Sequence, residues 1–350
     1  MVKIRLTIDG KAVEVEAGKT VLEAARGAGI KIPTICAHED LPHYGACRMC
    51  IVEIEGVRGY PTSCTTPAAD GMAVKTQTEE LIKQRNNILE LMLSGHPNSC
   101  LVCPHREPCE KYRPRPTKAG RTTRCTFCSN RDSCELREMA LSYPQGQLNL
   151  PTLYSDLKVE KYDPFMDRDY NLCILCGRCF RICEKIHGKP AISVLARGRW
   201  ARIGTSFYKS HLESGCTFCG SCIDICPTGS LSDRYAKWFG EPDEERASAC
   251  IICPEGCSLW LQASQEKCIA ARMTAFNHQA RLCAIGRFAY AQIVNAPDRL
   301  RRPQIRKGRE LIGTGWDDAI AGTASELKKH RGPGFALIAN QADTRENRFM

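Results

Sequence analysis

The sequence has no apolar run that approaches the roughly 18 consecutive residues of a membrane-spanning helix, so no direct membrane span is expected. Residues 1–5 alternate between apolar and polar side chains as a strand does, unlike a secretory signal peptide. No GxGxxG motif occurs, and Gly18-Lys19-Thr20 has Val13 where a phosphate-binding loop requires its first glycine. We therefore predict no nucleotide-binding motif, and we expect a cytoplasmic protein.

Cysteine, in contrast, is abundant. The chain has 23 cysteines among 350 residues, while 43% hydrophobic and 25% charged residues are typical of a soluble globular protein. A chain of this length can bury its own hydrophobic core, so disulfide staples are unnecessary. An odd number of cysteines in a protein without a leader indicates metal ligands.

The formal net charge of +10 counts every cysteine as neutral. Thiolates bound to iron–sulfur clusters are anionic, and they offset much of this excess. The densest basic stretch, residues 299–309, contains no aromatic side chain on which a base could stack. No nucleic-acid partner is therefore expected.

The first cysteine group lies in a predicted small sheet. Residues 2–9 and 12–16 alternate around a turn, Thr20 caps a short helix, and residues 51–54 form a strand. Four thiolates on the following loops suit a 2Fe-2S cluster, because iron prefers soft ligands and loop amides donate to the sulfurs. This 2Fe-2S site comprises Cys36, Cys47, Cys50 and Cys64. The alternative is zinc, which usually takes two close cysteine pairs.

Apolar residues between positions 81 and 93 recur on one face of a predicted helix. Thr76 and Glu79 have the spacing of a capping box at its start, and Gly95 ends it. The helix therefore delivers His96 to the next cysteine group.

The most specific signal is the bacterial ferredoxin run C-x2-C-x2-C-x3-C, which occurs twice. In that fold the fourth cysteine of each run ligates the other cluster. The first ferredoxin site, a 4Fe-4S site, is therefore predicted from Cys173, Cys176, Cys179 and Cys226. The second ferredoxin site, also 4Fe-4S, is predicted from Cys183, Cys216, Cys219 and Cys222.

A further group can chelate another 4Fe-4S cluster, although its spacing is less specific than the ferredoxin runs. This C-terminal site comprises Cys250, Cys253, Cys257 and Cys283. Cys268 has no partner in the pattern and is predicted to be a buried structural thiol.

Together these blocks resemble the large iron–sulfur subunit of complex I along nearly the whole chain. They are equally similar to the iron–sulfur half of NAD-linked formate dehydrogenase and other molybdopterin-oxidoreductase catalytic subunits. Residues 96–103 match the HxxxCxxC segment of the family, and residues 282–287, 298–300 and 316–319 are similar to the beginning of the molybdopterin-oxidoreductase domain. The resemblance implies that His96 and three cysteines hold a 4Fe-4S cluster, whose potential the histidine raises. The alternative for His96 is an ordinary imidazole at a helix C-terminus.

One part of the chain departs from the family by a local duplication, here called the duplicated segment (residues 100–134). A C-x2-C-x5-C motif occurs as Cys100, Cys103 and Cys109 and again as Cys125, Cys128 and Cys134. Residues 135–140 resemble the stretch after the third cysteine in the family, so Cys134 competes with Cys109 as the third cysteine ligand of the His96 cluster. The entropy of loop closure favours the contiguous set of His96, Cys100, Cys103 and Cys109, because these ligands are close in sequence and need no long loop.

The second copy then forms an additional 4Fe-4S site whose fourth ligand is open. Arg121 stands at the position that corresponds to His96 and cannot serve. His105, Asp132 or Cys268 are candidates. The alternative is a structural zinc held by two close pairs, Cys100 with Cys103 and Cys125 with Cys128.

We expect an α+β multidomain chain. The expected domains are a β-grasp 2Fe-2S ferredoxin domain (1–77), a helical one-His/three-Cys segment (78–150), a two-cluster 4Fe-4S ferredoxin domain (151–245), a small 4Fe-4S domain of the molybdopterin-oxidoreductase type (246–305) and the truncated start of an α/β pterin-type domain (306–350). In the last, residues 335–339 are predicted as a strand and Thr344 as a helix start. Ile285 stands where the molybdenum enzymes commonly carry Lys or Arg, so no molybdopterin is expected in this chain.

No catalytic residues are predicted, because the sequence offers no candidate nucleophile or general base. The expected function is an iron–sulfur subunit that relays single electrons between a flavin- or NAD(H)-bearing partner and at least one further redox subunit. Its expected cofactors are one 2Fe-2S cluster and four to five 4Fe-4S clusters. The alternatives are the N-terminal part of a molybdenum or tungsten formate dehydrogenase catalytic subunit and a zinc-dependent nucleic-acid-binding protein.

Overall fold

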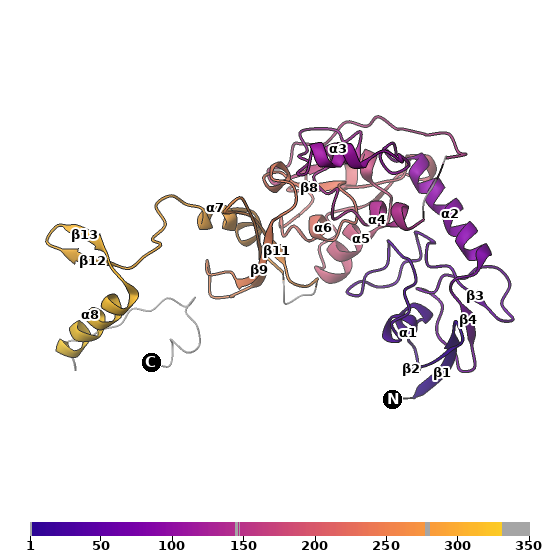
Figure 1. The fold of residues 1–350 in the computed structure, drawn as a ribbon, viewed down its shortest axis with the longest axis horizontal. Helices are drawn as coiled ribbons and strands as arrows, with labels where there is room; N and C mark the ends of the chain where they lie inside the picture. The colour runs from indigo at the N-terminus through magenta and orange to yellow at the C-terminus, as the bar shows by residue number, and fades with distance from the viewer. Residues whose placement is uncertain (1, 144–145, 147, 277–280, 331–350) are drawn as a thin grey trace.

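The computed structural model describes residues 2–143, 146, 148–276 and 281–330. The strand predicted at 335–339 and the helix start at Thr344 lie outside the described residues. Figure 1 shows the N-terminal domain at one end, the cysteine-rich segments in the middle, and β12, β13 and α8 at the other end. No helix in the described part of the chain is long and apolar enough to cross a membrane.

The N-terminal domain is a four-stranded sheet in the order β2-β1-β4-β3, with a helix against it. Its elements are β1 (Lys3–Ile8), β2 (Lys11–Glu16), α1 (Val21–Gly27), β3 (Glu53–Ile54) and β4 (Ala73–Lys75). The predicted hairpin is confirmed as β1 and β2, and Thr20 caps α1 in a reciprocal box with Glu23. The predicted strand at 51–54 is shorter, because Ile51 makes only an isolated bridge to Thr62.

Helix α2 (Glu79–Ser94) leads away from this sheet (Figure 1), and Gly95 ends it as predicted. The predicted cap at Thr76 is wrong. The Thr78 hydroxyl accepts from the Leu81 amide at 3.2 Å, whereas the Thr76 hydroxyl donates to Asp9 at 2.5 Å. The physical reason is that Thr76 directly follows β4, where its amide and hydroxyl tie this strand to the end of β1.

Two shorter helices, α3 (Glu107–Tyr112) and α4 (Glu135–Ser142), follow within and after the duplicated segment. Leu89 and Leu93 of α2 pack with Leu136 of α4 and with Cys36 and Cys47 in one buried cluster. Leu101 of the duplicated segment belongs to the same cluster, so this segment packs directly against the loops of the 2Fe-2S site.

The ferredoxin-like part is built from two small antiparallel ribbons and two short helices. The elements are β5 (Met166–Arg168) paired with β8 (Leu231–Asp233), β6 (Ser193–Leu195) paired with β7 (Arg202–Gly204), α5 (Arg178–Arg181) and α6 (Ser221–Asp224). Met166, Phe218 and Leu231 form its core together with cysteines of both ferredoxin sites. The cysteines thus take the place of ordinary core side chains.

The small C-terminal domain is an antiparallel sheet in the order β11-β10-β9 with a helix behind it. Its elements are β9 (Glu244–Ala249), β10 (Ser258–Ser264), β11 (Lys267–Met273) and α7 (Tyr290–Val294). Beyond it lie the hairpin β12 (Gln304–Lys307) and β13 (Glu310–Gly313), and helix α8 (Trp316–Lys329), none of whose residues is buried within the described chain. The expected combination of a 2Fe-2S domain and a ferredoxin-like domain in a mixed α and β chain is present.

Candidate metal centres

The 2Fe-2S site is a buried group of four thiols on the loops that follow α1. Cys36, Cys47, Cys50 and Cys64 are all buried. The Cys47 amide donates to the Cys36 sulfur at 3.4 Å. A hydrogen bond with Cys36 lowers the pKa of Cys47 to about 5, and one with Cys64 lowers the pKa of Cys50 to about 7. The same hydrogen bonds raise the pKa of Cys36 and of Cys64. The donor set fits the predicted cluster because four soft sulfur ligands are buried on neighbouring loops and a loop amide donates to one of them.

The two ferredoxin loops repeat one backbone geometry. Leu175 and Phe218, each the second residue between two cysteines, have positive φ angles of 54° and 51°. Gly177 and Gly220, each after the second cysteine, have φ angles of 74° and 77°. A side chain at Gly177 would lie 2.8 Å from Tyr44, so this position needs glycine for space as well as for conformation. Both loops wrap the chain around a centre in the same way.

The predicted exchange of the fourth cysteine between the two ferredoxin runs can be compared with two cavities in the structure. One cavity is lined by the four cysteines of the first ferredoxin site, Cys173, Cys176, Cys179 and Cys226. A second cavity is lined by those of the second ferredoxin site, Cys183, Cys216, Cys219 and Cys222. Each group therefore contains the distant cysteine that the ferredoxin rule assigns to it. The Phe218 amide donates to the Cys216 sulfur at 3.3 Å, as cluster-binding loops do.

Helix α5 ties the first ferredoxin site to the 2Fe-2S site. Arg178 and Arg181 are buried on this helix. Arg178 donates to the Ala37 carbonyl at 3.1 Å and to Glu135 at 2.8 Å. Arg181 donates to the carbonyl of Cys36. The ligand loops of two predicted clusters are thus joined by buried cations.

At the C-terminal site the four predicted cysteines influence one another electrostatically, although their burial differs. Burial raises the pKa of Cys250, and the charges of Cys253 and Cys283 add to this effect. The Gly286 amide donates to the Cys283 sulfur at 3.4 Å, and a side chain at Gly286 would lie 3.6 Å from the Cys250 sulfur. Cys268 lies apart on β11 and is buried, as predicted.

His96 is buried at the end of α2, and its Nε2 has no hydrogen-bond partner among the described residues. Burial lowers the pKa of His96 to about 4. A neutral imidazole with a free, buried nitrogen is the form that binds a metal, and an ordinary surface imidazole at a helix end has no such constraint. The observation fits a cluster ligand better than a helix cap.

In the duplicated segment the structure brings Cys100 of the first copy next to Cys125 of the second copy. Cys100 and Cys125 form a hydrogen bond that lowers the pKa of Cys100 to about 5. Cys125 also interacts electrostatically with Cys128 and Cys134. Cys109, in contrast, is exposed on α3.

The candidate fourth ligands of the additional site are not brought to it. Asp132 forms a salt bridge with Arg131, and Cys268 belongs to the small C-terminal domain. His105 is exposed. Among the described residues, no three His, Cys, Asp or Glu side chains converge closely enough to hold a single metal ion.

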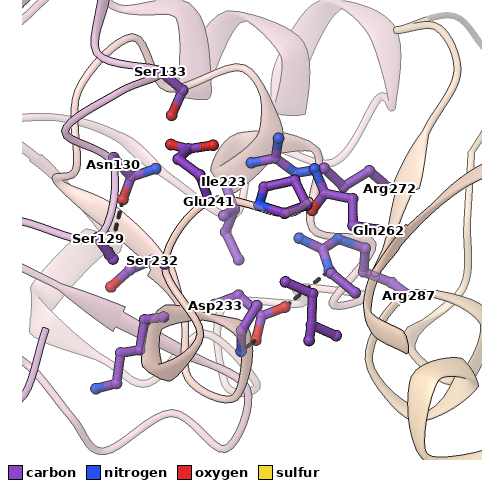
Figure 2. A pocket seen from close by; sticks show the side chains of 16 residues that line it. Ser129, Asn130, Ser133, Ile223, Ser232, Asp233, Glu241, Gln262, Arg272 and Arg287 are labelled. Carbon is purple, nitrogen blue, oxygen red and sulfur yellow. Dashed lines mark hydrogen bonds and ion pairs between the residues drawn. The ribbon is translucent and has the colours of Figure 1, made fainter. Parts of the chain in front are cut away.

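A cavity of about 50 Å³ lies where three parts of the chain meet (Figure 2). Ser129 and Asn130 of the duplicated segment, Asp233 of β8 and Arg287 of the small C-terminal domain line it. The buried Arg287 donates to Asp233 and to Asp224, each at 2.9 Å. This volume holds a few water molecules. The cavity is therefore a polar junction between domains.

Sequence reasoning missed the buried cations near the cysteines. Arg168 lines the cavity of the first ferredoxin site, and Lys118 forms a buried ion pair with Asp169 at 3.6 Å. For Arg178 and Arg181 a signal existed, because both lie inside the first ferredoxin run. Arg168 and Lys118 carry no such signal, since neither belongs to a cysteine motif.

Two protein-family models match separate parts of the chain. A model described as a 2Fe-2S iron–sulfur cluster binding domain matches residues 2–79. A model described as the ferredoxin-like domain of NADH-quinone oxidoreductase subunit 3 matches residues 163–232. A solved structure, an NAD+-reducing NiFe-hydrogenase in the H2-reduced state, superimposes with a TM-score of 0.57 and 28% identity, covering 68% of this chain and 90% of that one.

Curated relatives match along almost the entire chain. A G-type subunit of NADH-quinone oxidoreductase from Rhizobium meliloti is 33% identical over 90% of this chain and 34% of its own length. The alpha subunit of NADPH-Fe(3+) oxidoreductase from Geobacter sulfurreducens is 33% identical over 99% of this chain and 38% of its own length. The chain thus spans little more than a third of these relatives. It carries a 2Fe-2S cluster-binding domain and a ferredoxin-like domain of the NADH-quinone oxidoreductase subunit 3 type, and its resemblance to the large iron–sulfur subunit of complex I is confirmed.

Proposed function

We propose that this chain is an iron–sulfur electron-transfer subunit of an oxidoreductase complex similar to NADH-quinone oxidoreductase. It relays single electrons between a flavin- or NAD(H)-bearing partner and at least one further redox subunit in the cytoplasm. The observation that carries the proposal is the convergence of cysteines from two separate motifs into two cavities of the ferredoxin-like part. When bound, the clusters supply the one-electron chemistry, while the protein sets their spacing and potentials.

The ligands of the proposed clusters are those of the 2Fe-2S site, of the two ferredoxin sites and of the C-terminal site. His96 and three cysteines of the duplicated segment hold a further 4Fe-4S cluster. Cys134 packs against the buried cluster that contains Leu89 and Leu93 of α2, the helix that leads to His96, whereas Cys109 does not, and this supports Cys134 over Cys109 as a ligand of the His96 cluster. The remaining cysteines of the segment hold the additional cluster, which brings the total to one 2Fe-2S and five 4Fe-4S clusters.

A second candidate function is the N-terminal part of a molybdenum or tungsten formate dehydrogenase. The hairpin β12–β13 and helix α8, none of whose residues is buried, favour this function. They follow the C-terminal site, where a pterin domain is expected to begin from the resemblance. Ile285 speaks against it, and its side chain is 53% exposed.

Metal analysis and turnover of the anaerobically purified chain test both functions. Six clusters correspond to about 22 iron atoms per chain and five to about 18, and a structural zinc in place of the additional cluster gives about 18 iron and one zinc. We expect reduction by dithionite without formate, hydrogen or NADH turnover. Molybdenum or tungsten near one atom per chain, or turnover by the pure chain, would overturn the electron-relay function.

A further inference from the structure

A buried arginine, Arg168 at the end of β5, lies at the first ferredoxin site. Its side chain is 4% exposed and lines the same cavity as Cys173, Cys176, Cys179 and Cys226. Burying a guanidinium is costly unless an anion or strong acceptors compensate it. Arg168 forms no salt bridge within 4.0 Å to any described carboxylate. The centre of the Tyr170 ring lies 5.7 Å from the guanidinium carbon, but burial raises the pKa of Tyr170, so its phenol is neutral. The compensating negative charge must therefore come from another group.

The hydrogen bonds of Arg168 fix its orientation. One terminal nitrogen, Nη1, donates to the Ile203 carbonyl at 2.7 Å, and the other, Nη2, lies 2.9 Å from Nε2 of His211. The opposite nitrogen of that imidazole, Nδ1, contacts the carboxylate of Asp163. The imidazole therefore separates the arginine from this carboxylate. Nε of Arg168 has no hydrogen-bond partner among the described residues.

We propose that Arg168 provides the positive charge and an N–H donor for the cluster of the first ferredoxin site, and thereby raises its reduction potential. A reduced cluster carries one more negative charge than the oxidised one, so a nearby buried cation stabilises the reduced form. Its other N–H groups are held by Ile203 and by His211, which lines the cavity of the second ferredoxin site. The Arg168–His211–Asp163 chain is therefore a polar bridge between the two cavities. The inference rests on the proposed function in one respect, namely that the first site holds a 4Fe-4S cluster.

The test is an EPR-monitored redox titration of the anaerobically purified chain. The signal of the first site is identified by its absence in Cys226→Ser. In Arg168→Gln we expect the equilibrium constant for reduction of this cluster to fall at least tenfold, which is about 59 mV for a one-electron couple. Arg234→Gln is the matched control, because Arg234 is partly exposed and already paired with Asp167 at 2.9 Å. It should change the constant less than threefold.

A charge-conserving variant keeps the test decisive if Arg168→Gln does not load its cluster. In protein labelled with 15N only in the guanidinium nitrogens of arginine, the signal of the first site should show a 15N coupling that Arg168→Lys abolishes. The midpoint in Arg168→Lys should stay within a threefold change of the constant. An unchanged midpoint in Arg168→Gln, equal shifts in Arg168→Gln and Arg234→Gln, or a 15N coupling that persists in Arg168→Lys would each overturn the proposal. Absence of any 4Fe-4S signal in the wild-type chain would instead contradict the proposed function.

Discussion

The ferredoxin-like part and the duplicated segment both contain a cysteine motif twice, but the fold treats the two repeats differently. In the ferredoxin-like part each copy has the same left-handed residues, Leu175 with Gly177 and Phe218 with Gly220, and each cavity takes one cysteine from the other copy. In the duplicated segment the first copy ends on the exposed helix α3, whereas the second copy is packed against α2 and α4. Equal spacing in sequence therefore does not give equal geometry.

The difference has a physical origin in the surroundings of each copy. Both ferredoxin loops are enclosed by short strands and helices of one small core. The second copy of the duplicated segment meets the ferredoxin-like part through Cys128, whose sulfur lies opposite Gly229, and the backbone amide of Glu135 donates to the Pro227 carbonyl at 2.9 Å. Cys109 of the first copy is exposed instead. We infer that the packing around a cysteine, more than its position in the motif, determines whether its thiol can bind the same cluster as the other cysteines.

The largest effect is expected when a ligand cysteine of the ferredoxin-like part is removed. Cys226→Ser should lose the 4Fe-4S cluster of the first ferredoxin site, which is about four iron atoms per chain, because the other three ligands have no substitute thiol in their cavity. Iron analysis and EPR measure the loss. Cys268→Ser is the control, since Cys268 is a buried thiol that belongs to no proposed site. Loss of iron in the control, or none in Cys226→Ser, would contradict the assignment.

The next test compares the two copies of the duplicated segment directly. Cys134→Ser should abolish the EPR signal that shows coupling to 15N-labelled histidine, because Cys134 packs against the buried cluster that contains Leu93, at the end of α2 next to His96. Cys109→Ser should leave this signal in place, because Cys109 is exposed on α3. The reverse result would restore the contiguous set of His96, Cys100, Cys103 and Cys109.

Local features of the fold were predictable because their signals are local. The hairpin at Asp9-Gly10, the Thr20 cap and the end of α2 at Gly95 each depend on a few neighbouring residues. The cap at Thr76 was wrong because Thr76 and Thr78 both precede a helical pattern, and the choice depends on the distant Asp9.

Ligand sets in the candidate sites were likewise predictable only where the spacing of the cysteines determines them. The ferredoxin sets could be read from spacing, since the fold fixes the ligand exchange. The choice between Cys109 and Cys134 could not, because loop closure favours the nearer residue while burial favours the farther one. Arg168 could not be predicted at all, since a buried cation on a three-residue strand leaves no periodic pattern.

A smaller effect, on potential and not on occupancy, is expected at His96. His96→Cys should keep the cluster but lower its midpoint potential on the order of 100 mV, because an added thiolate is anionic whereas imidazole is neutral. Potentiometric EPR measures the shift. His105→Cys makes the same exchange at an exposed position and should leave the midpoint unchanged. A cluster midpoint that is unaffected in His96→Cys would remove His96 from the ligands.

The smallest effect is expected at the contact between the two regions. A side chain at Gly229 would lie 2.8 Å from the Cys128 sulfur and 3.2 Å from Oδ1 of Asn130, while the Gly229 carbonyl accepts from Lys118 at 2.8 Å. Because both sides are packed, Gly229→Ala should destabilise the chain by about 1–3 kcal/mol.

The crowding acts on Cys128, so iron should be lost from the duplicated segment while the signal of the first ferredoxin site persists. Thermal unfolding measures the destabilisation, and iron analysis together with the EPR signal of the first ferredoxin site measures where iron is lost. Gly120→Ala is the control, because no atom lies within 4 Å of its added carbon. If Gly229→Ala removes the signal of the first ferredoxin site instead, the ferredoxin-like part and the duplicated segment are coupled as one centre. The contrast between the two repeats would then not hold.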